Sequence, residues 1–343
     1  MRRSQNILFA LSHPAHLNFF KNMIREFSVD PEKNVFVSVL NRGKLPKIAK
    51  WELSEFNLPV FIVGRHRGTF LSIIFEANLL PLFTFMKLIV LKRIDVVISV
   101  GGFIPGFCMK VIFRRNLQFD DDPESGKNFF LERLTASQLF IPFYDGIFTK
   151  VTPIHTLKEW AYLSPKYFTP KRTTLLKYQL KEKEYIFLRE VSTGSLNYMQ
   201  QDENIILSIS GSFPDSFGYV LSLENKSNRN LYPKNWIILE EPIEDIHSLI
   251  YYSKMVISSG DSMAREAAML GVPAIYCGYR IMKANNIMIE KGLLFKVPKE
   301  NVSSQLKELS KRKESDLEQQ QFRNELLTEW VDINELIRKE INN

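Results

Sequence analysis

The residues best suited to chemistry lie between Met255 and Ile275, where an apolar run gives way at once to small and polar side chains. The run from Met255 to Ser258 is typical of a buried strand, and a helix is expected from about Ser262 to Leu270. Between them Gly260 lets the backbone turn tightly, and the free amide groups of a helix start attract phosphate. We expect five consecutive residues to bind a phosphate-bearing substrate: Ser259, Gly260, Asp261, Ser262 and Met263.

Glu266 lies one turn into this helix, where its carboxylate could accept hydrogen bonds from a ribose diol. Gly271-Val-Pro then ends the helix and starts the next strand. The simpler interpretation is that Asp261 or Ser262 only caps the helix, as such residues commonly do. The two roles are compatible, and the segment favours one half of a nucleotide-sugar site.

A second group of chemical side chains follows the first expected strand, in Ser12-His-Pro-Ala-His-Leu-Asn18. His13 or His16 could act as a catalytic base or contact a phosphate or sugar, and Asn18 could bind substrate. Alternatively, either histidine caps the helix that begins near Leu17. Two histidines without further ligands cannot hold a metal ion.

The third group is the acidic run Asp120, Asp121 and Asp122, with Glu124 close behind, at the end of another short strand. Neighbouring carboxylates raise one another's pKa, so one of the three aspartates could serve as a general base. A divalent-metal site is a competing interpretation. An exposed acidic turn that caps a helix is the third.

Other residues at expected strand ends complete the candidate binding site. Gly101 and Gly102 follow the strand at 95–100, and Arg189 ends the strand at 185–189 before the small-residue turn of Ser192 and Gly194. Glu241 follows the strand at 236–239 and could line a base pocket, whereas His247 is expected at the surface or in the core.

These groups can form one site only in a fold that brings strand ends together, and the sequence predicts such a fold, of the α/β class. Its 343 residues suit two domains of ordinary size. Short apolar strands alternate with helices in both halves, including a strand expected at 205–209, which favours parallel sheets. Three prolines between 153 and 177 mark the crossover, so we expect domains 1–165 and 166–343, the second with charged terminal helices.

Composition excludes several classes of protein. The two cysteines stand in apolar runs and offer neither a disulfide framework nor a cysteine metal site. No uncharged stretch is long enough to span a bilayer, and the N-terminal apolar run is too short for a signal peptide. Residues 1–170 hold 22 Lys and Arg against 14 Asp and Glu, which suggests an acidic partner, either anionic lipid or a phosphorylated substrate. No nucleic-acid recognition motif is found.

Five segments together resemble the bacterial and archaeal family called domain of unknown function 354. They are His13-Pro-Ala-His16 with Phe20-Lys21, Asp120-Asp-Asp122, Glu159-Trp-Ala-Tyr-Leu-Ser-Pro165 with Phe168-Thr-Pro, Leu188-Arg189, and Gly260-Asp-Ser-Met-Ala-Arg-Glu-Ala-Ala-Met-Leu-Gly271. That family is similar to glycosyltransferases of the GT-B fold and to nonhydrolysing UDP-N-acetylglucosamine 2-epimerases. The resemblance implies two Rossmann-like domains that face each other across a cleft.

The resemblance also implies roles for individual residues. In such folds the element that maps onto Gly260, Asp261, Ser262 and Glu266 contacts the diphosphate and ribose, and loops of the first domain face the acceptor or the reacting sugar. The chain departs from the family where a histidine often follows the Arg189 strand, because residues 195–198 read Ser-Leu-Asn-Tyr. A role for that histidine cannot be carried over, which weakens the epimerase interpretation.

The first functional hypothesis is a metal-independent glycosyltransferase that moves a sugar from a nucleotide-sugar donor to a surface-polysaccharide or lipid-linked acceptor. The expected donor is a UDP-sugar. Such an enzyme would take part in cell-envelope polysaccharide biosynthesis and would lie in the cytoplasm, with peripheral contact at the inner face of the membrane. No cofactor beyond the nucleotide-sugar substrate is expected. The alternatives are a UDP-N-acetylhexosamine 2-epimerase, which the aspartates at 120–122 support, and a non-catalytic nucleotide-sugar-binding protein.

Overall fold

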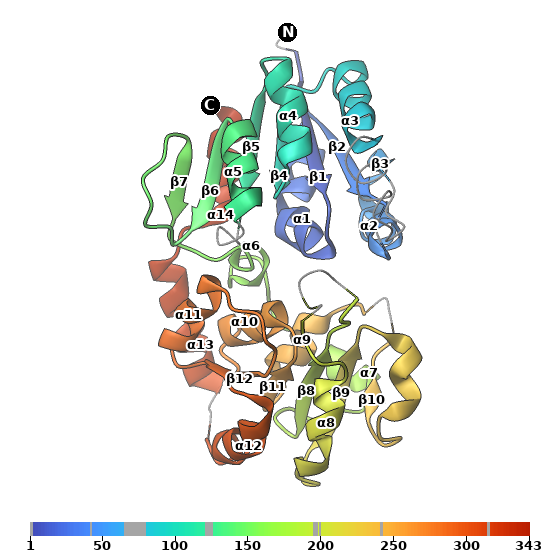
Figure 1. The fold of residues 1–343 in the computed structure, drawn as a ribbon, viewed down its shortest axis with the longest axis vertical. Helices are drawn as coiled ribbons and strands as arrows, with labels where there is room; N and C mark the ends of the chain where they lie inside the picture. Colours follow the sequence, from blue (N-terminus) through green and yellow to red (C-terminus); the bar gives the residue numbers. More distant parts are fainter. Residues whose placement is uncertain are drawn as a thin grey trace. The chain divides into compact units, whose positions relative to one another are not determined.

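The chain folds into two compact units, which the computed structural model describes over residues 3–41, 43–64, 80–120, 126–194, 198, 200–240, 243–313 and 316–343. The first, unit 1, contains Met1–Tyr162 and Trp330–Asn343, and the second, unit 2, contains Leu163–Glu329. Each unit is built on its own parallel β-sheet with helices between the strands (Figure 1). The predicted α/β fold class is thereby confirmed.

The sheet of unit 1 has seven parallel strands in the order β3-β2-β1-β4-β5-β6-β7. They are β1 (Gln5–Leu11), β2 (Lys33–Leu40), β3 (Val60–Val63), β4 (Val96–Val100), β5 (Arg115–Phe119), β6 (Gln138–Pro142) and β7 (Val151–Ile154). Alternate residues of β1 serve the two faces, because Ile7 and Phe9 join one apolar cluster and Leu8 and Ala10 join another. Burial on both faces explains the continuous apolar runs of these strands.

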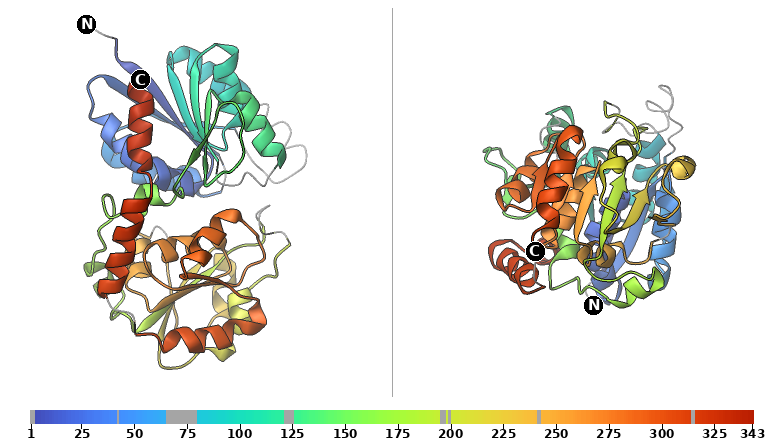
Figure 2. Two further views of the ribbon diagram at one scale, coloured as in Figure 1. Left: turned by 90° about the vertical axis from the view of Figure 1, so that its left-hand side faces the viewer. Right: turned by 90° about the horizontal axis from the view of Figure 1, so that it is seen from below.

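Helices cover both faces of this sheet. They are α1 (Pro14–Ser28), α2 (Leu45–Glu52), η1 (Ser54–Phe56), α3 (Leu80–Leu91), α4 (Phe103–Val111), α5 (Gly126–Thr135) and α14 (Ile333–Asn342), with α6 (Trp160–Leu163) at the crossover. Helices α1, α2 and α14 pack on the Phe9 side, and α3 and α4 pack on the Leu8 side. The left view of Figure 2 shows α14 in red on one side of the sheet and the teal and green helices on the other.

The C-terminal helix α14 corrects the predicted domain assignment, since the sequence places all of 166–343 in the second domain. Ile333, Ile337 and Ile341 recur every four residues and are buried in the apolar cluster of unit 1. Arg338 adds a two-pronged ion pair to Glu26 of α1, with N–O distances of 2.6 and 2.8 Å. The apolar stripe thus assigns Trp330–Asn343 to unit 1.

The sheet of unit 2 has six parallel strands in the order β10-β9-β8-β11-β12-β13. They are β8 (Tyr185–Glu190), β9 (Gly218–Leu223), β10 (Ile237–Ile238), β11 (Met255–Ser258), β12 (Ala274–Tyr276) and β13 (Leu294–Lys296). The chain order reverses between β8 and β11, and in open α/β sheets ligands bind outside the carboxyl ends of strands at such a point. The loops after Glu190 and Ser258 therefore mark the candidate site of this unit.

Helices also surround the sheet of unit 2, and one of them, α8 (Ile205–Ile209), stands where the sequence predicts a strand. They are α7 (Thr173–Lys177), α8 (Ile205–Ile209), η3 (Ser210–Ser212), η4 (Lys226–Leu231), α9 (Ile246–Tyr251), α10 (Asp261–Met269), α11 (Lys283–Glu290), η5 (Lys299–Asn301), α12 (Val302–Ser310) and α13 (Asp316–Glu329). The strand predicted at 205–209 is helix α8, because the carboxylate of Glu190 accepts a hydrogen bond from the Ile206 amide at 2.7 Å and so satisfies an N–H of the helix start. Within the described ranges, no helix has the length and hydropathy needed to cross a bilayer.

Candidate functional site

The predicted turn between β11 and α10 is closely packed against the neighbouring strand end. Ser258 Oγ accepts a hydrogen bond from the Gly260 amide at 3.0 Å and donates one to the Gly260 carbonyl at 2.6 Å. A Cβ atom at Gly260 would lie only 2.5 Å from Cγ1 of Val191, which follows β8. Glycine is thus needed here for close approach of two loops.

Helix α10 begins at this turn with Gly260 as its cap residue. Glycine supplies no side-chain acceptor for the amide N–H groups of the first turn, which have no acceptor within the helix. Ser262 and Met263 in that turn are half-buried, and Gly260 itself is buried. The helix start therefore has the form of a site for an anionic group.

Asp261, the first residue of α10, is fully buried and held by protein groups. Its carboxylate accepts hydrogen bonds from the Tyr198 hydroxyl at 2.7 Å and from the Arg265 guanidinium at 2.8 Å, and Arg280 lies 3.5 Å away. Burial alone would raise the pKa of Asp261, but the two guanidinium groups and the Tyr198 hydroxyl outweigh it and hold the pKa below its ordinary value. Asp261 thus anchors the helix start, and a contact between Asp261 and a ligand stays a prediction.

Glu266 lies on α10 with only 8% of its surface exposed. Its Oε2 atom is 3.4 Å from Nε2 of His247 on α9, whose ring also packs near Phe168. His247 is predicted from the sequence at the surface or in the core, and the structure places it beside Glu266. A contact with ribose remains a prediction for Glu266, and His247 joins the candidate site as the group beside it.

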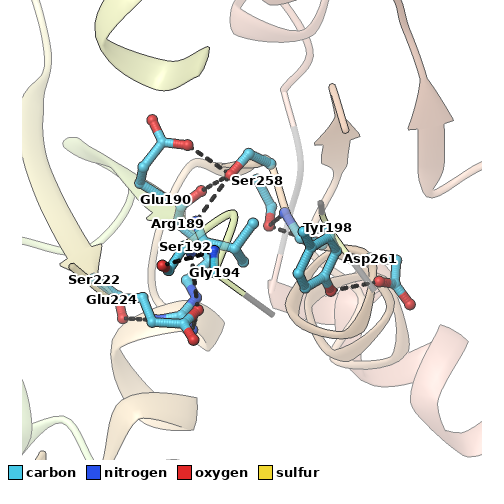
Figure 3. Close-up of polar contacts among 12 residues, drawn as sticks. Arg189, Glu190, Ser192, Gly194, Tyr198, Ser222, Glu224, Ser258 and Asp261 are labelled. Atoms are coloured by element: carbon cyan, nitrogen blue, oxygen red, sulfur yellow. Dashed lines mark hydrogen bonds and ion pairs between the residues drawn. The ribbon is translucent and has the colours of Figure 1, made fainter. Parts of the chain in front are cut away.

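A hydrogen bond between Ser259 and Glu190 joins the two loops at the switch point, where Figure 3 shows Glu190 close to Ser258. The Ser259 hydroxyl donates to Glu190 Oε1 at 2.7 Å and accepts a hydrogen bond from the Val191 amide at 3.0 Å. The other oxygen of Glu190 accepts from the Ile206 amide and from the Tyr232 hydroxyl, at 2.7 and 3.1 Å. Burial raises the pKa of Glu190, although these hydrogen bonds act in the opposite direction. Ser259 therefore positions the turn through the buried carboxylate of Glu190, which is not among the predicted site residues.

Arg189, Ser192 and Gly194 form a connected group beside the same turn. Arg189 donates hydrogen bonds to Ser222 at 3.1 Å and Glu224 at 2.9 Å, and the Ser192 amide also donates to Glu224 at 3.3 Å. The Gly194 amide donates to Ser192 Oγ at 3.3 Å. The structure thus brings these three predicted residues together, with Glu224 as the shared partner of Arg189 and Ser192 and with Gly194 bonded to Ser192. Glu241 lies outside the described residues.

In unit 1 both histidines of the first loop bond to the polypeptide near the start of α1. His13 is the cap residue, and its Nδ1 atom accepts a hydrogen bond from the Ala15 amide at 3.2 Å. His16 Nδ1 lies 3.2 Å from the Ser12 hydroxyl, and the two imidazole rings are 5.9 Å apart between centroids. Asn18 is half-buried on the same helix. The capping role considered for His13 is present, and a catalytic role for either histidine remains a prediction.

The carboxyl ends of β4 and β5 carry the other predicted residues of unit 1. Gly101 has a φ of +60°, which glycine adopts without strain, and Gly102 is the cap residue of α4. Asp120 is buried at the end of β5, whereas Asp121 and Asp122 lie outside the described residues. Glu132 on α5 is 3% exposed and was not predicted, yet its Oε1 atom would lie 3.6 Å from a Cβ at Gly101. Two buried carboxyl groups therefore accompany this glycine turn.

Among the residues that the structure describes, no group of three or more His, Cys, Asp or Glu side chains is arranged to hold a metal ion. Cys108 and Cys277 are both buried and unbridged. The polar groups at the switch point are hydroxyls, backbone amides and the ion pairs of Asp261 with Arg265 and Arg280.

Replacing Gly260 with alanine is expected to destabilise the protein by about 1–3 kcal/mol, because the new Cβ would overlap Val191. The double variant Gly260→Ala/Val191→Ala should recover much of that loss, since truncation of Val191 removes the atom that the Cβ meets. Urea denaturation of the two single variants and the double variant measures the coupling. Additive effects would contradict the close approach of the two loops.

Solved structures with a similar fold cover nearly the whole chain. The spinosyn rhamnosyltransferase SpnG complexed with thymidine diphosphate has a TM-score of 0.69 and 12% identity over 99% of this chain and 100% of its own. The Staphylococcus aureus MnaA–UDP complex has a TM-score of 0.67 and 17% identity over 90% and 88% of the two chains. The Neisseria meningitidis UDP-GlcNAc 2-epimerase bound to UDP-GlcNAc has a TM-score of 0.65 and 14% identity over 99% and 100%. These likenesses confirm the GT-B type of fold with two Rossmann-like units.

Sequence comparison supplies the family. A search of curated protein sequences gave no match. The family model described as "Protein of unknown function (DUF354)" matches residues 164–337, which is half of the 343-residue chain and includes the whole α10 region. This match confirms the resemblance seen in the sequence motifs. The chain is a member of the DUF354 family.

Proposed function

We propose that the protein is a glycosyltransferase and that unit 2 holds the nucleoside diphosphate of its nucleotide-sugar donor at the start of α10. The observation that carries the proposal is the glycine-capped helix start at a topological switch point, with Ser262 and Met263 half-buried in its first turn. The thymidine diphosphate and UDP complexes of structures with this fold are consistent with such a ligand.

In this proposal the residues of unit 2 serve binding and the leaving group. The first-turn amides of α10 stabilise the charge that develops on the departing diphosphate, and Glu266 accepts hydrogen bonds from the ribose. Asp261 does not repel the phosphates strongly, because Arg265 and Arg280 offset its charge. Arg189, Ser192 and Gly194 would border the same ligand on the β8 side, and no metal ion is required in the proposed reaction.

Acceptor activation is assigned to unit 1. A base must remove the proton of the acceptor hydroxyl, and His13, His16 and Asp120 are the described candidates at the carboxyl edge of its sheet. The acceptor proposed is a saccharide of a surface polysaccharide or its lipid-linked precursor, reached from the cytoplasm. The acidic residues 121 and 122 share this candidacy on sequence grounds alone.

A specific observation favours a second candidate, a UDP-N-acetylhexosamine 2-epimerase. Such an enzyme removes and returns a proton at the second carbon of the sugar, and carboxylates are suited to that task. Asp120 and Glu132 are both buried in unit 1, at the end of β5 and beside the Gly101 turn. The missing histidine after Arg189 still counts against this reaction.

The binding half of the proposal is tested with UDP, GDP, CDP and TDP by titration calorimetry. Replacing Glu266 with alanine should weaken binding of the preferred nucleotide about 10-fold or more, because hydrogen bonds to a charged group contribute about 1.5–3 kcal/mol. Glu290→Ala, at the exposed end of α11, is the matched control and should bind like the parent protein. Failure of all four nucleotides to bind would refute the proposed site.

The reaction is identified by incubating the protein with the sugars of the preferred nucleotide, with and without a membrane lipid extract and with a chelator present. Release of free nucleotide that depends on the extract supports the transferase. A changed sugar in the absence of any acceptor would support the epimerase instead. Binding without either reaction would identify a non-catalytic nucleotide-sugar-binding protein.

A further inference from the structure

Helices α3, α4 and α5 of unit 1 expose more large apolar side chains than the helices on the opposite face of the sheet, α1, α2 and α14. The first three helices lie next to one another on one face of the sheet (Figure 1). Side chains with about half or more of their surface exposed include Phe83, Leu91, Phe107, Phe113 and Phe130. By contrast α1 and α14, which are described in full, expose none of their large apolar side chains, and Trp51, 48% exposed, is the one that the fully described α2 exposes. The apolar surface is therefore a property of this face.

Helix α3 shows how unusual the pattern is for a helix facing water. In its sequence Leu-Pro-Leu-Phe-Thr-Phe-Met-Lys-Leu-Ile-Val-Leu the one charged residue is Lys87. Phe85 and Ile89 are buried against the sheet, whereas Phe83 and Leu91 point outward with 72% and 67% of their surface exposed. A surface helix normally carries polar residues on its outer side. The outer side of α3 is instead suited to contact with another apolar phase.

Basic residues surround this apolar surface. Lys87, Lys92, Arg93, Lys110, Lys127 and Lys150 are all exposed. Acidic groups are few among the described residues of the same stretch. Asp120 and Glu132 are buried, and Asp95 is paired with Arg114 at 2.9 Å, so Asp145 is the described acidic residue left exposed there. The face therefore combines exposed apolar side chains with a positive charge.

A groove of about 360 Å³ between α4, α5 and the loop from β6 to β7 brings the two properties together. Its cations are Lys110, Arg133 and Lys150, and its apolar walls include Ile147 and Phe148. The Arg133 guanidinium lies 3.8 Å above the Phe148 ring, and Lys110 Nζ donates to the Leu134 carbonyl at 2.6 Å. An ammonium or guanidinium group beside an apolar wall suits a ligand with a phosphate next to a hydrocarbon chain.

We propose that the α3–α5 face docks on a bilayer that contains anionic phospholipid, with the groove at Lys110 and Lys150 receiving a lipid phosphate. Apolar side chains that enter the headgroup boundary and basic residues that attract anionic lipid together give such binding. The charge complementarity favours an anionic membrane over a neutral one. The inference is independent of nucleotide binding by unit 2, so each can fail without the other.

The test is cosedimentation of the full chain with vesicles of phosphatidylcholine alone and of phosphatidylcholine mixed with phosphatidylglycerol. We expect binding to the mixed vesicles only. It should weaken when salt is raised from about 0.1 M to about 1 M, which shortens the Debye length from about 10 Å to about 3 Å. Sodium glycerophosphate in solution should not displace the protein, because it lacks the acyl chains.

Two double variants separate the contributions. Lys110→Gln/Lys150→Gln should weaken binding about 30-fold, from the attraction of two basic residues to an anionic surface. Phe113→Ser/Ile147→Ser should weaken it at least as much, and both side chains are more than nine-tenths exposed, so the fold is preserved. The matched controls in unit 2 are Leu176→Ser on α7 and Lys307→Gln/Lys311→Gln at the end of α12, which should bind like the parent protein.

Nucleotide titration of the same variants confirms that unit 2 is intact. Binding to both kinds of vesicle alike, binding to neither, or displacement by glycerophosphate would overturn the proposal. Unchanged binding of both double variants would also overturn it. If a partner protein occupies this face instead, the protein should bind neither kind of vesicle.

Discussion

Replacing Asp261 with alanine should destabilise the protein by about 3–5 kcal/mol, the usual cost of leaving one partner of a buried ion pair alone. Asp261 is fully buried, and Arg265, its partner at 2.8 Å, has 1% of its side chain exposed. The Tyr198 hydroxyl would lose its acceptor at the same time. Urea denaturation followed by circular dichroism measures the loss as a lower midpoint of the transition that includes unit 2.

Asp202→Ala is the matched control for this variant. Asp202 forms a similarly short ion pair with Lys299, at 2.6 Å, but half of its side chain is exposed, and exposed pairs contribute little. Its midpoint should stay close to that of the parent protein. Equal shifts for the two variants would contradict a special role for the buried pair.

Acidity gives an independent test of Asp261. Because its folded-state pKa lies below the ordinary aspartate value of 3.8, the stabilising contribution of Asp261 is present above about pH 4 and is lost as pH falls through the folded-state pKa. The stability advantage of the parent protein over Asp261→Asn should therefore shrink in strongly acidic buffer. An advantage that is constant with pH would show that the aspartate charge is not what stabilises the helix start.

Replacing Glu190 with alanine is the second large expected effect, a loss of about 3 kcal/mol. The change would leave the Ser259 and Tyr232 hydroxyls and the Ile206 amide without their common acceptor, and buried unsatisfied donors cost about 1–3 kcal/mol each before relaxation. Loosening of Ser259 should also weaken nucleotide binding. Denaturation and calorimetric titration of the same variant measure the two effects.

Glu224→Ala is the control, because Glu224 holds the same β8 loop through Arg189 and the Ser192 amide but is 41% exposed, so water can replace it. The pH dependence has the opposite sign to that of Asp261. Burial raises the folded-state pKa of Glu190 above 4.5, so its ionisation costs stability as pH rises from 4.5 through the folded-state pKa. Glu190→Gln should lack that decline, and a parallel decline in both proteins would contradict the assignment.

Much of the fold could be predicted because its signals are local. Apolar strands alternating with helices indicate parallel sheets, and the strand at 255–258 and the helix beginning near 261 lie where the residue pattern places them. Residues 205–209 form a helix and not the predicted strand. The prediction is wrong because a short run with three isoleucines has no periodicity that separates the two structures. Their helical form depends on the contact with Glu190, fifteen residues or more upstream, which lies outside the local sequence pattern.

The candidate site can be predicted from the sequence only where its residues are neighbours in the chain. Gly260 and its neighbours are consecutive, so their turn could be recognised. Ser259 and Glu190 are 69 residues apart and Tyr198 and Asp261 are 63 apart, and their meeting depends on the order of strands β8 and β11. Glu132 and His247 likewise gain significance only from the side chains that the fold places beside them.

The position of α14 has a consequence for how the chain is made. Most of unit 1 precedes unit 2 in the chain, yet Ile333, Ile337 and Ile341, which follow unit 2, complete the apolar cluster that surrounds Phe9 and Phe20. While a ribosome synthesises Leu163–Glu329, which takes roughly ten to thirty seconds at ordinary rates, the nascent unit 1 must keep that surface uncovered. Unit 2 is one continuous stretch of chain and needs no such wait. The unit translated second is therefore the first that can finish folding.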